Sequence, residues 1–434
     1  MGGAKIAWMP RIQAQQNGLE PMQSSIYISG VAMTQFGRHF ERSLASLAQE
    51  ALDGALKDAG ASTTDIGQAF YSGVTQGPLL GQNAIPGQVL LQKIGLVGLP
   101  VYNIENACAS GTSAFQLAVQ ALRSGACDVA IAIGAEKMNI EDKKRVLSIF
   151  EGGWDVTTKE ENEARLMALG KGIEVPDGWE SERPYSKFMA IYASMCRYWM
   201  KNFGTTQRQI AAVSAKNHNH SVHNIYAQYR EPFTIEQILA APPITYPLTM
   251  PMCSPVSDGA AAVILCTEAG LKRLSGDRRR AIKVAATAIA TVIPRGPDDF
   301  EKASCRRAGQ MAYEQAGIGP EDVSVVEVHD ATAMGEVMAV EYLQLTPMGG
   351  AGLAAEAGEL SIGGRVPVNP SGGLECKGHP IGATGLGQIF ELVTQLRGEA
   401  GLRQVEGAKV ALQENGGGQV AYEEGVVNVN IFTR

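Results

Sequence analysis

Apolar positions recur along the chain with two different periods, and together they predict strands that alternate with helices. An apolar run over residues 26–31 predicts a first strand. Within residues 43–59, leucine and alanine recur at helical spacing. This helix is expected to end at Gly60, a residue suited to the left-handed conformation at a helix C-terminus. Similar units follow, so the pattern predicts mixed α/β sheets covered by helices.

Two stretches of the sequence repeat the same signals in the same order. Residues 59–65 carry Ala-Gly and then an Asp, and residues 316–322 carry the same three residues 257 positions later. A second, weaker match relates residues 108–133 to residues 379–412, each a small-residue turn, a helix and a strand. We therefore predict a duplicated fold, with two mixed β-sheets layered with helices and an inserted loop domain.

The predicted organisation has an extension, two halves and one insertion. Residues 1–25 are polar and without pattern, so we expect an N-terminal extension. The N-terminal half comprises residues 26–137 and 190–270, and the C-terminal half comprises residues 271–434. Residues 138–189, extending toward position 250, are charged and aromatic with few apolar strands. A connection of that length is usually a lid or a binding insertion.

Composition excludes several classes of protein. Glycine contributes 50 of the 434 residues without a collagen-like period, and the net charge of −7 includes no basic block, which argues against nucleic acid as a partner. The chain has no run of about 18 apolar residues and no signal-peptide core at its start. Its seven cysteines form no CxxC pair, which favours a reducing compartment and argues against a zinc ribbon. We expect a cytoplasmic protein without a membrane partner.

The strongest candidate nucleophile is Cys108, in the segment Asn-Ala-Cys-Ala-Ser-Gly-Thr-Ser (residues 106–113). An apolar stripe downstream predicts a helix, so Cys108 precedes a helix N-terminus, where unpaired N–H groups and the helix dipole favour a thiolate. The alternative is an inert buried cysteine, and the local sequence leaves the two interpretations equally open. Four other cysteines lie on helix or strand patterns and are assigned to packing: Cys127, Cys196, Cys266 and Cys305.

Three further segments place polar groups beside glycines. His379 lies in the glycine-rich loop 371–385, where it is either a functional base or a histidine bonded to backbone. His329 ends an apolar strand, the position at which open α/β sheets bind ligands. Gly416–Gly418 follow another strand and could present N–H groups to an oxyanion. The histidine loop has no phosphate-binding glycine pattern.

Taken together, these segments resemble the thiolase superfamily. Cys-Ala-Ser-Gly (108–111) is similar to its nucleophile loop, and Gly-His-Pro-Ile-Gly-Ala-Thr-Gly (378–385) is similar to its histidine loop. Ser-Asp-Gly-Ala-Ala (257–261) resembles its Asp-Gly-Ala-Ala turn. Val-His-Asp (328–330), in place of Asn-Glu-Ala-Phe, and the segment 224–230 resemble the sterol-carrier-protein-type and archaeal branch. The resemblance covers nearly everything but the N-terminal extension.

The resemblance implies CoA-dependent thiolytic cleavage of a 3-oxoacyl-CoA, or the reverse Claisen condensation. It implies Cys108 as the nucleophile, His379 as its base, and His329 with His379 as donors to the first oxyanion. The backbone N–H groups of Cys108 and Gly417 would hold the enolate, and Asp330 would support the site. CoA is then a co-substrate, and the reaction requires no metal or bound organic cofactor.

The sequence departs from the family pattern at two places. Asn415, a further supporting candidate, stands where most thiolases carry a second catalytic cysteine, which would transfer the proton work to His329 or His379. Residues 331–333 are Ala-Thr-Ala where the branch usually has an aromatic residue, which suggests an enlarged pocket for a bulky or aromatic substrate such as benzoylsuccinyl-CoA. Cys376, near His379, is a weak candidate for a second thiol.

Alternatives remain open at this point. One is a non-catalytic acyl-CoA-binding scaffold subunit, and another is a retro-aldolase-type relative, which would not need the nucleophile. The resemblance also implies a homodimeric core and a small OB-fold partner subunit that carries a zinc ribbon. The cluster His218, His220 and His223 does not converge on one helix face, so a solvated face is favoured over a zinc site.

Overall fold

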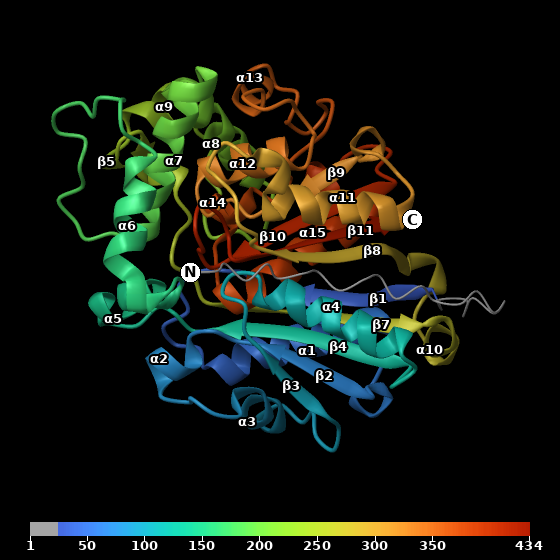
Figure 1. The fold of residues 1–434 in the computed structure, drawn as a ribbon. Helices are drawn as coiled ribbons and strands as arrows, with labels where there is room; N and C mark the ends of the chain where they lie inside the picture. Colours follow the sequence, from blue (N-terminus) through green and yellow to red (C-terminus); the bar gives the residue numbers. More distant parts are fainter. Residues whose placement is uncertain (1–24) are drawn as a thin grey trace, which may run out of the picture.

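One mixed sheet of nine strands runs through the computed structural model, which describes residues 25–434 (Figure 1). The strand order is β3-β2-β4-β7-β1-β8-β11-β10-β9. The strands are β1 (Ile26–Met33), β2 (Gln68–Ser72), β3 (Val101–Ile104), β4 (Val129–Glu136), β7 (Gly259–Thr267), β8 (Ile282–Thr291), β9 (Val325–Glu327), β10 (Val410–Gly417) and β11 (Val426–Thr433). Of the predicted N-terminal extension, residues 1–24 lie outside the described part of the chain.

The sheet consists of two halves that are joined at β1 and β8. Only two residue pairs, Tyr27–Lys283 and Ile28–Ile282, connect these strands, whereas β1 pairs with β7 along its whole length. The predicted α/β fold with layered helices is confirmed, with one correction. The two expected sheets form a single continuous sheet, because β1 and β8 meet where both strands begin and their backbone hydrogen bonds join the halves.

Helices cover both outer faces of the sheet and also fill the space between its halves. Phe115 of α4 and Leu386 of α15 share one core with Ala261 of β7 and Ala411 of β10, so these two helices lie between the halves. Helix α1 packs on β1 and β7 from outside, and α11 packs on β8 and β11. The helices outside the insertion are α1 (Leu44–Ala59), α2 (Gln76–Leu80), α3 (Pro86–Lys93), α4 (Ser110–Arg123), α10 (Glu268–Arg273), α11 (Ser304–Ala316), α12 (Ala333–Tyr342), α13 (Ala351–Glu356), α14 (Gly373–Lys377) and α15 (Ile381–Arg397).

The two halves of the sheet have the same topology. The strands follow the order β2-β4-β7-β1 in the first half and β9-β10-β11-β8 in the second. Helix α1 ends at Gly60 and α11 ends at Gly317, both in the left-handed conformation, and a short 3-10 turn leads from each helix to the next strand. The duplication predicted from two matches in the sequence is therefore confirmed.

The connection between β4 and β7 is mostly helical. It contains α5 (Lys143–Ile149), α6 (Lys159–Ala168), α7 (Lys187–Phe203), α8 (Gln207–Ser221), α9 (Ile235–Ala240) and a two-stranded sheet of β5 (Pro243–Thr245) and β6 (Leu248–Thr249). Figure 1 shows α5, α6 and α9 beside the large sheet. Tyr192 of α7 lies in the same core as Val337 of α12. The insertion thus packs against the C-terminal half.

The strands in the middle of the N-terminal half are buried on both faces. Every residue of β4 and β7 is buried, as expected when helices cover a sheet from both sides. At Gly134 of β4, a side chain would overlap the carbonyl oxygen of Gly382 at the start of α15. Glycine at this position lets the helix that follows His379 approach the sheet.

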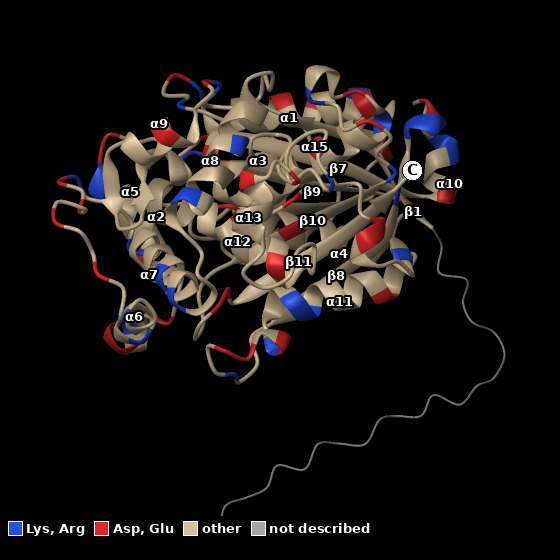
Figure 2. Cartoon of the chain, turned by 90° about the horizontal axis from the view of Figure 1, so that it is seen from above, with Lys and Arg blue, Asp and Glu red and all other residues tan. Residues whose placement is uncertain are grey.

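The surface of the described residues carries charges of both signs. In Figure 2, basic and acidic residues are interspersed around the molecule. No described helix combines the length and the apolar content that crossing a membrane would require.

Candidate active site

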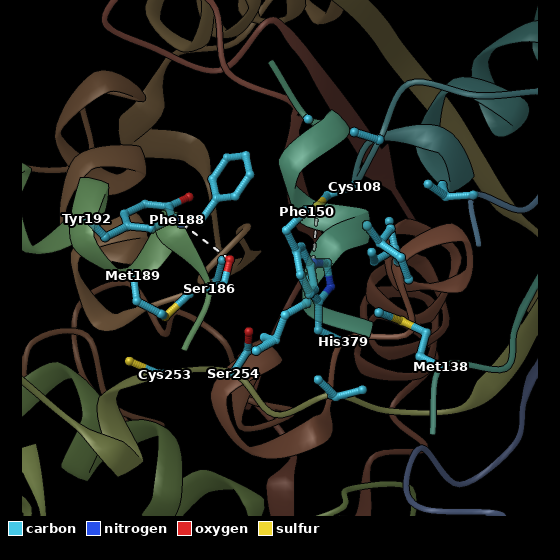
Figure 3. Close-up of a pocket in the computed structure, with 18 of the residues that line it drawn as sticks. Cys108, Met138, Phe150, Ser186, Phe188, Met189, Tyr192, Cys253, Ser254 and His379 are labelled. Carbon is cyan, nitrogen blue, oxygen red and sulfur yellow. Dashed lines mark hydrogen bonds between the residues drawn. The ribbon is translucent and has the colours of Figure 1, made fainter. Parts of the chain in front are cut away.

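A cavity of about 450 Å³ lies at the N-terminal ends of α4 and α15, and Figure 3 shows residues that line it. Its lining includes the three candidate residues Cys108, His329 and His379. Aromatic residues form much of the remaining wall: Phe150, Tyr185, Phe188, Tyr192 and Tyr229. Among the described residues that line it, the acidic ones are Glu105 and Glu424, and none is Lys or Arg. The cavity therefore combines an apolar wall with a small group of reactive side chains, as ligand pockets commonly do.

Cys108 and His379 form the central contact of this cavity. The Nε2 atom of His379 lies 3.2 Å from the Cys108 sulfur (Figure 3). The Nδ1 atom lies 2.7 Å from the Thr384 hydroxyl, whose own proton is donated to the carbonyl of Pro380 at 3.1 Å. Thr384 must therefore accept a hydrogen bond from Nδ1–H, which leaves Nε2 without a proton and facing the thiol. This is the geometry of a base beside a nucleophile.

The loop before α4 holds Cys108 at the helix N-terminus. Ala107 has a φ of 48°, which is strained for a residue with a side chain. The Ser110 hydroxyl accepts the N–H of Asn106 at 2.8 Å and donates to the Ala107 carbonyl at 2.6 Å. The Asn106 amide donates to Ser113 at 2.9 Å. These contacts fix the backbone that aims the sulfur at the cavity.

Two segments distant in the sequence hold His379. The backbone N–H of His379 donates to the Ser257 hydroxyl at 3.1 Å, and Gly378 has a φ of 107°, which favours glycine. The N–H of Gly382, in the first turn of α15, donates to the buried carboxylate of Glu136 at 3.1 Å. An acceptor at this position also suits the positive end of the helix dipole.

His329 adds a second imidazole to the cluster. Its Nδ1 atom lies 2.7 Å from a carboxylate oxygen of Glu424, and its ring centroid lies 5.3 Å from that of His379. One nitrogen of each histidine and the Cys108 sulfur lie within 4.8 Å of one another. Such donors could also surround a zinc ion, but the Nε2–sulfur hydrogen bond already engages two of the three. We assign no metal to this cluster.

The two histidines differ in charge because their surroundings differ. Burial, together with the nearby charge of His329, lowers the pKa of His379 well below its usual value, so His379 is neutral. Burial also acts to lower the pKa of His329, but interaction with the nearby Cys108 and Glu424 side chains outweighs burial and raises this pKa well above its usual value. The site therefore holds one neutral and one charged imidazole.

The predicted supporting residues Asn415 and Asp330 and the predicted backbone donor Gly417 lie around the cluster and not within it. The Asn415 side chain accepts a hydrogen bond from Thr112 of α4 at 2.7 Å and does not line the cavity. Asp330 accepts the N–H of Leu374 at 2.7 Å and thereby holds the start of α14. Gly417 packs against the loop before α4, where a side chain would overlap the carbonyl of Asn106. The cavity wall itself is formed by the next residue, Gly418.

The second thiol near the site is Cys253, and the sequence did not point to it. Cys376, the residue suggested by the sequence, is fully buried, lies outside the cavity wall, and has a pKa raised well above its usual value by burial and by Glu375. Cys253 lines the cavity, and burial raises its pKa as well. Neither thiol lies in the cluster of Cys108 and the two histidines.

Among the described residues, the three histidines of the insertion belong to no cluster with metal-ligand spacing, and the predicted solvated helix face is wrong for two of them. His220 is buried, bonds the Asn369 carbonyl at 3.0 Å, and accepts the N–H of Ile362 at 3.1 Å. His218 is buried 3.2 Å from the Pro251 carbonyl, and only His223 is exposed. The reason is that α8 lies between other elements and buries the face that carries His218 and His220.

The sequence did not indicate two residues that contact the histidines of the cluster, Thr384 and Glu424. Thr384 follows His379 by five residues, so the first turn of a helix beginning there could have suggested it. Glu424 lies between β10 and β11, and no motif marks it. Only the folded chain brings this carboxylate to His329, a residue 95 positions earlier.

Comparison with known proteins fits this geometry. The family model "Thiolase, N-terminal domain" matches residues 26–239, and the model "Thiolase C-terminal domain-like" matches residues 286–428. An acetyl-CoA acetyltransferase of Methanothermobacter thermautotrophicus is 35% identical over 410 residues, which cover 94% of this chain and 99% of that protein. Sterol carrier protein 2 of Homo sapiens is 35% identical over 405 residues, covering 90% of this chain and 69% of that protein.

A thiolase subunit and a solved aldolase structure are also similar to this chain. The benzoylsuccinyl-CoA thiolase subunit BbsB of Thauera aromatica is 32% identical over 397 residues, which cover 89% of this chain and 92% of that protein. The solved structure of an Ltp2-ChsH2(DUF35) aldolase has the same fold, with a TM-score of 0.73 and 20% sequence identity over 94% of this chain and 98% of that one.

The chain belongs to the thiolase family. It is a thiolase-type acyltransferase that acts with CoA.

Proposed function

We propose that this protein cleaves a 3-oxoacyl-CoA by CoA-dependent thiolysis, or forms one by the reverse condensation, through an S-acyl intermediate on Cys108. The observation that carries the proposal is the 3.2 Å contact between the Cys108 sulfur and the Nε2 atom of His379. Thr384 fixes the tautomer in which this nitrogen accepts a proton. A thiol with an oriented base beside it is an activated nucleophile.

The first half of the reaction forms the acyl-enzyme. His379 takes the proton of Cys108, and the thiolate attacks the 3-keto carbon of the substrate. His329 and His379 hold the oxyanion. When the oxyanion collapses, the bond between C2 and C3 breaks, and its electron pair passes to an acyl-CoA enolate. The backbone N–H groups of Cys108 and Gly417 are our candidates for holding the enolate oxygen.

The second half returns the enzyme to its starting state. One of the histidines protonates the enolate at C2, which releases the first acyl-CoA. The thiol of CoA then gives up its proton to that histidine and attacks the S-acyl carbonyl. Cys108 leaves as a thiolate and recovers its own proton from His379, so the second acyl-CoA forms and no net proton is gained or lost.

The cavity favours a bulky or aromatic acyl group. Ala331 lines it at the wall where an aromatic residue was expected from the family pattern, and aromatic side chains such as Phe150 and Phe188 face it. Benzoylsuccinyl-CoA, the substrate named for the relative BbsB, is one candidate. The test is to compare kcat/KM for short, long and aromatic 3-oxoacyl-CoA esters. A preference for the short esters would contradict this part of the proposal.

We also propose a homodimeric core and a small OB-fold partner subunit with a zinc ribbon. The relative BbsB is itself described as a subunit, which supports an assembly of more than one chain. Native mass spectrometry of the protein purified from its source would measure the composition. A single type of chain with full activity would contradict the partner subunit.

Replacement of Cys108 tests the central proposal. Cys108→Ala should lower the rate of CoA-dependent cleavage by at least about 10³-fold, because the nucleophile is lost. Cys127→Ala, which removes a thiol that does not line the cavity, is the matched control and should keep its activity. Intact-protein mass spectrometry of the wild type with substrate should show an acyl adduct, and peptide mapping should place it on Cys108.

Two outcomes would favour the alternatives. Unchanged cleavage by Cys108→Ala would point to a retro-aldolase, which does not need the thiol. Binding of acyl-CoA by the wild type without adduct or turnover would point to a scaffold subunit.

A further inference from the structure

We infer that His329 is the acid that protonates the enolate, and that Glu424 is the positioning residue that keeps His329 in its acidic form. This inference rests on the proposed function, because thiolysis is the reaction that leaves an enolate at this site. Asn415 stands at the position of the second cysteine of most thiolases, but it cannot supply the proton. An amide side chain is not an acid at neutral pH, and that of Asn415 accepts a hydrogen bond from Thr112 outside the cavity.

The hydrogen bonds of His329 leave one nitrogen for the substrate. Nδ1 is engaged with Glu424 at 2.7 Å, and Nε2 has no hydrogen-bond partner within residues 25–434. One nitrogen of His329 lies within 4.8 Å of the Cys108 sulfur, and Nδ1 is already paired with Glu424, so Nε2 is the nitrogen left to protonate the leaving enolate. His379 is engaged differently, since it holds the proton of Cys108 until the thiol is regenerated.

The backbone makes room for Glu424 beside His329. A side chain at Gly416 would overlap the Glu424 carboxylate, so this glycine is what lets the carboxylate lie against β10. The loop that carries Glu424 is attached to the insertion, because the N–H of Gln419 donates to the carbonyl of Gly153 at 2.7 Å. The run of glycines at residues 416–418 thus serves the carboxylate as well as the nucleophile loop.

Glu414 and Glu423 have different roles around this pair. Glu423 is engaged with Arg295 at 2.8 Å, in a buried ion pair. Glu414 accepts the backbone N–H of His329 at 2.9 Å with one oxygen, and its other oxygen has no partner in the described chain. Burial, and then the charge of Glu424, raise the pKa of Glu414 to about 8, so Glu414 is protonated near neutral pH. Glu424 is then the carboxylate that pairs with the imidazolium.

A second, smaller space lies behind His329. It has a volume of about 30 Å³, which is enough for a water molecule. The titratable groups that line this space or share the main cavity with His329 are Cys108, Tyr192, Cys305, Tyr342, His379, Glu414, Glu423 and Glu424, together with Glu105, Tyr185, Tyr229 and Cys253. Among them, Glu424 is the carboxylate in direct hydrogen-bond contact with the imidazole, and it acts together with Cys108 to raise the pKa of His329.

Glu424→Gln tests the inference, because it keeps the shape of the side chain and removes the charge. We expect kcat for thiolysis to fall by about 10²-fold, the size of a general-acid contribution. The alkaline limb of the pH profile should move to lower pH, because His329 loses its proton more easily without the carboxylate. Glu424→Asp, which keeps the charge, should leave that limb closer to the wild-type position.

A half-reaction distinguishes a role of Glu424 in enolate protonation from a role in activating Cys108. Acyl transfer from a saturated acyl-CoA to Cys108 forms no enolate and requires the acid only to protonate a CoA thiolate, a much weaker base, so its rate, followed by intact-protein mass spectrometry, should fall less than about tenfold in Glu424→Gln, against about 10²-fold for thiolysis. Glu406→Gln, at an exposed carboxylate remote from the cavity, is the charge control and should behave as the wild type.

The outcomes are distinguishable. If Glu424→Gln slows acylation and thiolysis equally, or leaves both unchanged with an unmoved pH profile, the inference is overturned. If the wild type itself forms no S-acyl adduct, the result contradicts the proposed thiolysis and not the specific role of Glu424.

Discussion

At the scale of single residues, hydrogen bonds decide what each side chain of the site can do. His379 and His329 are both buried beside the same sulfur, yet one bonds a hydroxyl and the other a carboxylate. A hydroxyl that already donates its proton can only accept, which fixes a neutral tautomer, whereas a carboxylate favours the imidazolium. The same residue type is thus neutral at one position and charged at the other.

The first residue-scale prediction concerns Thr384. Thr384→Val keeps the shape but removes the acceptor for Nδ1–H of His379, so the productive tautomer is no longer favoured. We expect kcat to fall by about 10- to 100-fold, with little change in KM. Thr384→Ser restores the hydroxyl and should recover most of the rate. An unaffected Thr384→Val enzyme would show that this bond does not orient the base.

The second residue-scale prediction concerns acidic pH. His379 works as a base only while it is neutral, and burial together with the charge of His329 lowers its pKa below 6.5. Activity should therefore persist as the pH falls past 6.5 and decline only below the lowered pKa. The pH dependence of kcat/KM at the acid limb measures this value. A limb centred at or above 6.5 would contradict the assignment of His379 as the buried base.

At the scale of elements, the site depends on how closely α4 and α15 cross. Gly111 of α4 and Gly385 of α15 lie at the contact, where a side chain on Gly111 would come within 2.9 Å of the Gly382 carbonyl. A side chain on Gly385 would overlap the Thr112 hydroxyl and lie 2.7 Å from Asn415. Since Cys108 precedes one helix and His379 precedes the other, the spacing of the helices sets the distance between sulfur and base.

Gly385→Ala tests this dependence. The added methyl group should force the two helices apart and lengthen the contact between Cys108 and His379, so we expect at least a tenfold loss of kcat together with a lower Tm. Gly309→Ala, in α11 on the outer layer, is the control for placing alanine in a helix, because its nearest neighbour is the flexible end of Leu343 at 3.0 Å. A fully active Gly385→Ala enzyme would show that the crossing tolerates the extra volume.

At the scale of the whole molecule, two duplicated halves enclose a buried polar layer behind the site. Glu336 pairs with Lys216 at 2.9 Å, and Glu327 pairs with Lys377 at 3.0 Å, all four side chains being almost fully buried. Glu375 lies in the same layer, accepts a hydrogen bond from Asn217 at 3.3 Å, and has one oxygen without a partner among the described residues. This layer is where the insertion meets the loops that carry His329 and His379.

Stability should therefore depend on the protonation of Glu375. Burial raises the pKa of Glu375 from 4.5 to about 8, so the folded protein holds a proton that the unfolded chain releases between these values. This contribution to stability is fully present below pH 4.5 and is lost as the pH rises through 8. Relative to Glu375→Gln, the wild type should lose stability by up to about 1.4 kcal/mol for each pH unit in that window.

Urea denaturation at pH 5, 6, 7 and 8 measures this difference. Glu406→Gln, at an exposed carboxylate, should track the wild type at every pH. A constant difference between Glu375→Gln and the wild type across the series would mean that Glu375 is already ionised in the folded protein.

The sequence by itself determined the features that depend on local chemistry. Apolar periodicity predicts the helices and strands, and the echo between residues 59–65 and 316–322 predicts the duplication, because helix ends and buried faces are specified by neighbouring residues. The loops around Cys108, His379 and His329 are recognisable for the same reason, since glycines and small residues mark close approaches of the backbone. The sequences of those loops do not determine the tautomers and charges of the two histidines.

The tertiary structure decided what depends on distant partners. It joins the two sheets through β1 and β8, places Asn415 against Thr112 and away from the cavity, and brings Glu424 to His329. It also buries His218 and His220, which the sequence pattern had left on a solvated face. Burial and hydrogen-bond partners come from segments far apart in the chain, and these two quantities set the pKa of an imidazole or a carboxyl. Local sequence therefore pointed to Cys108 and the two histidines as candidates, and only the folded chain assigned their proton states.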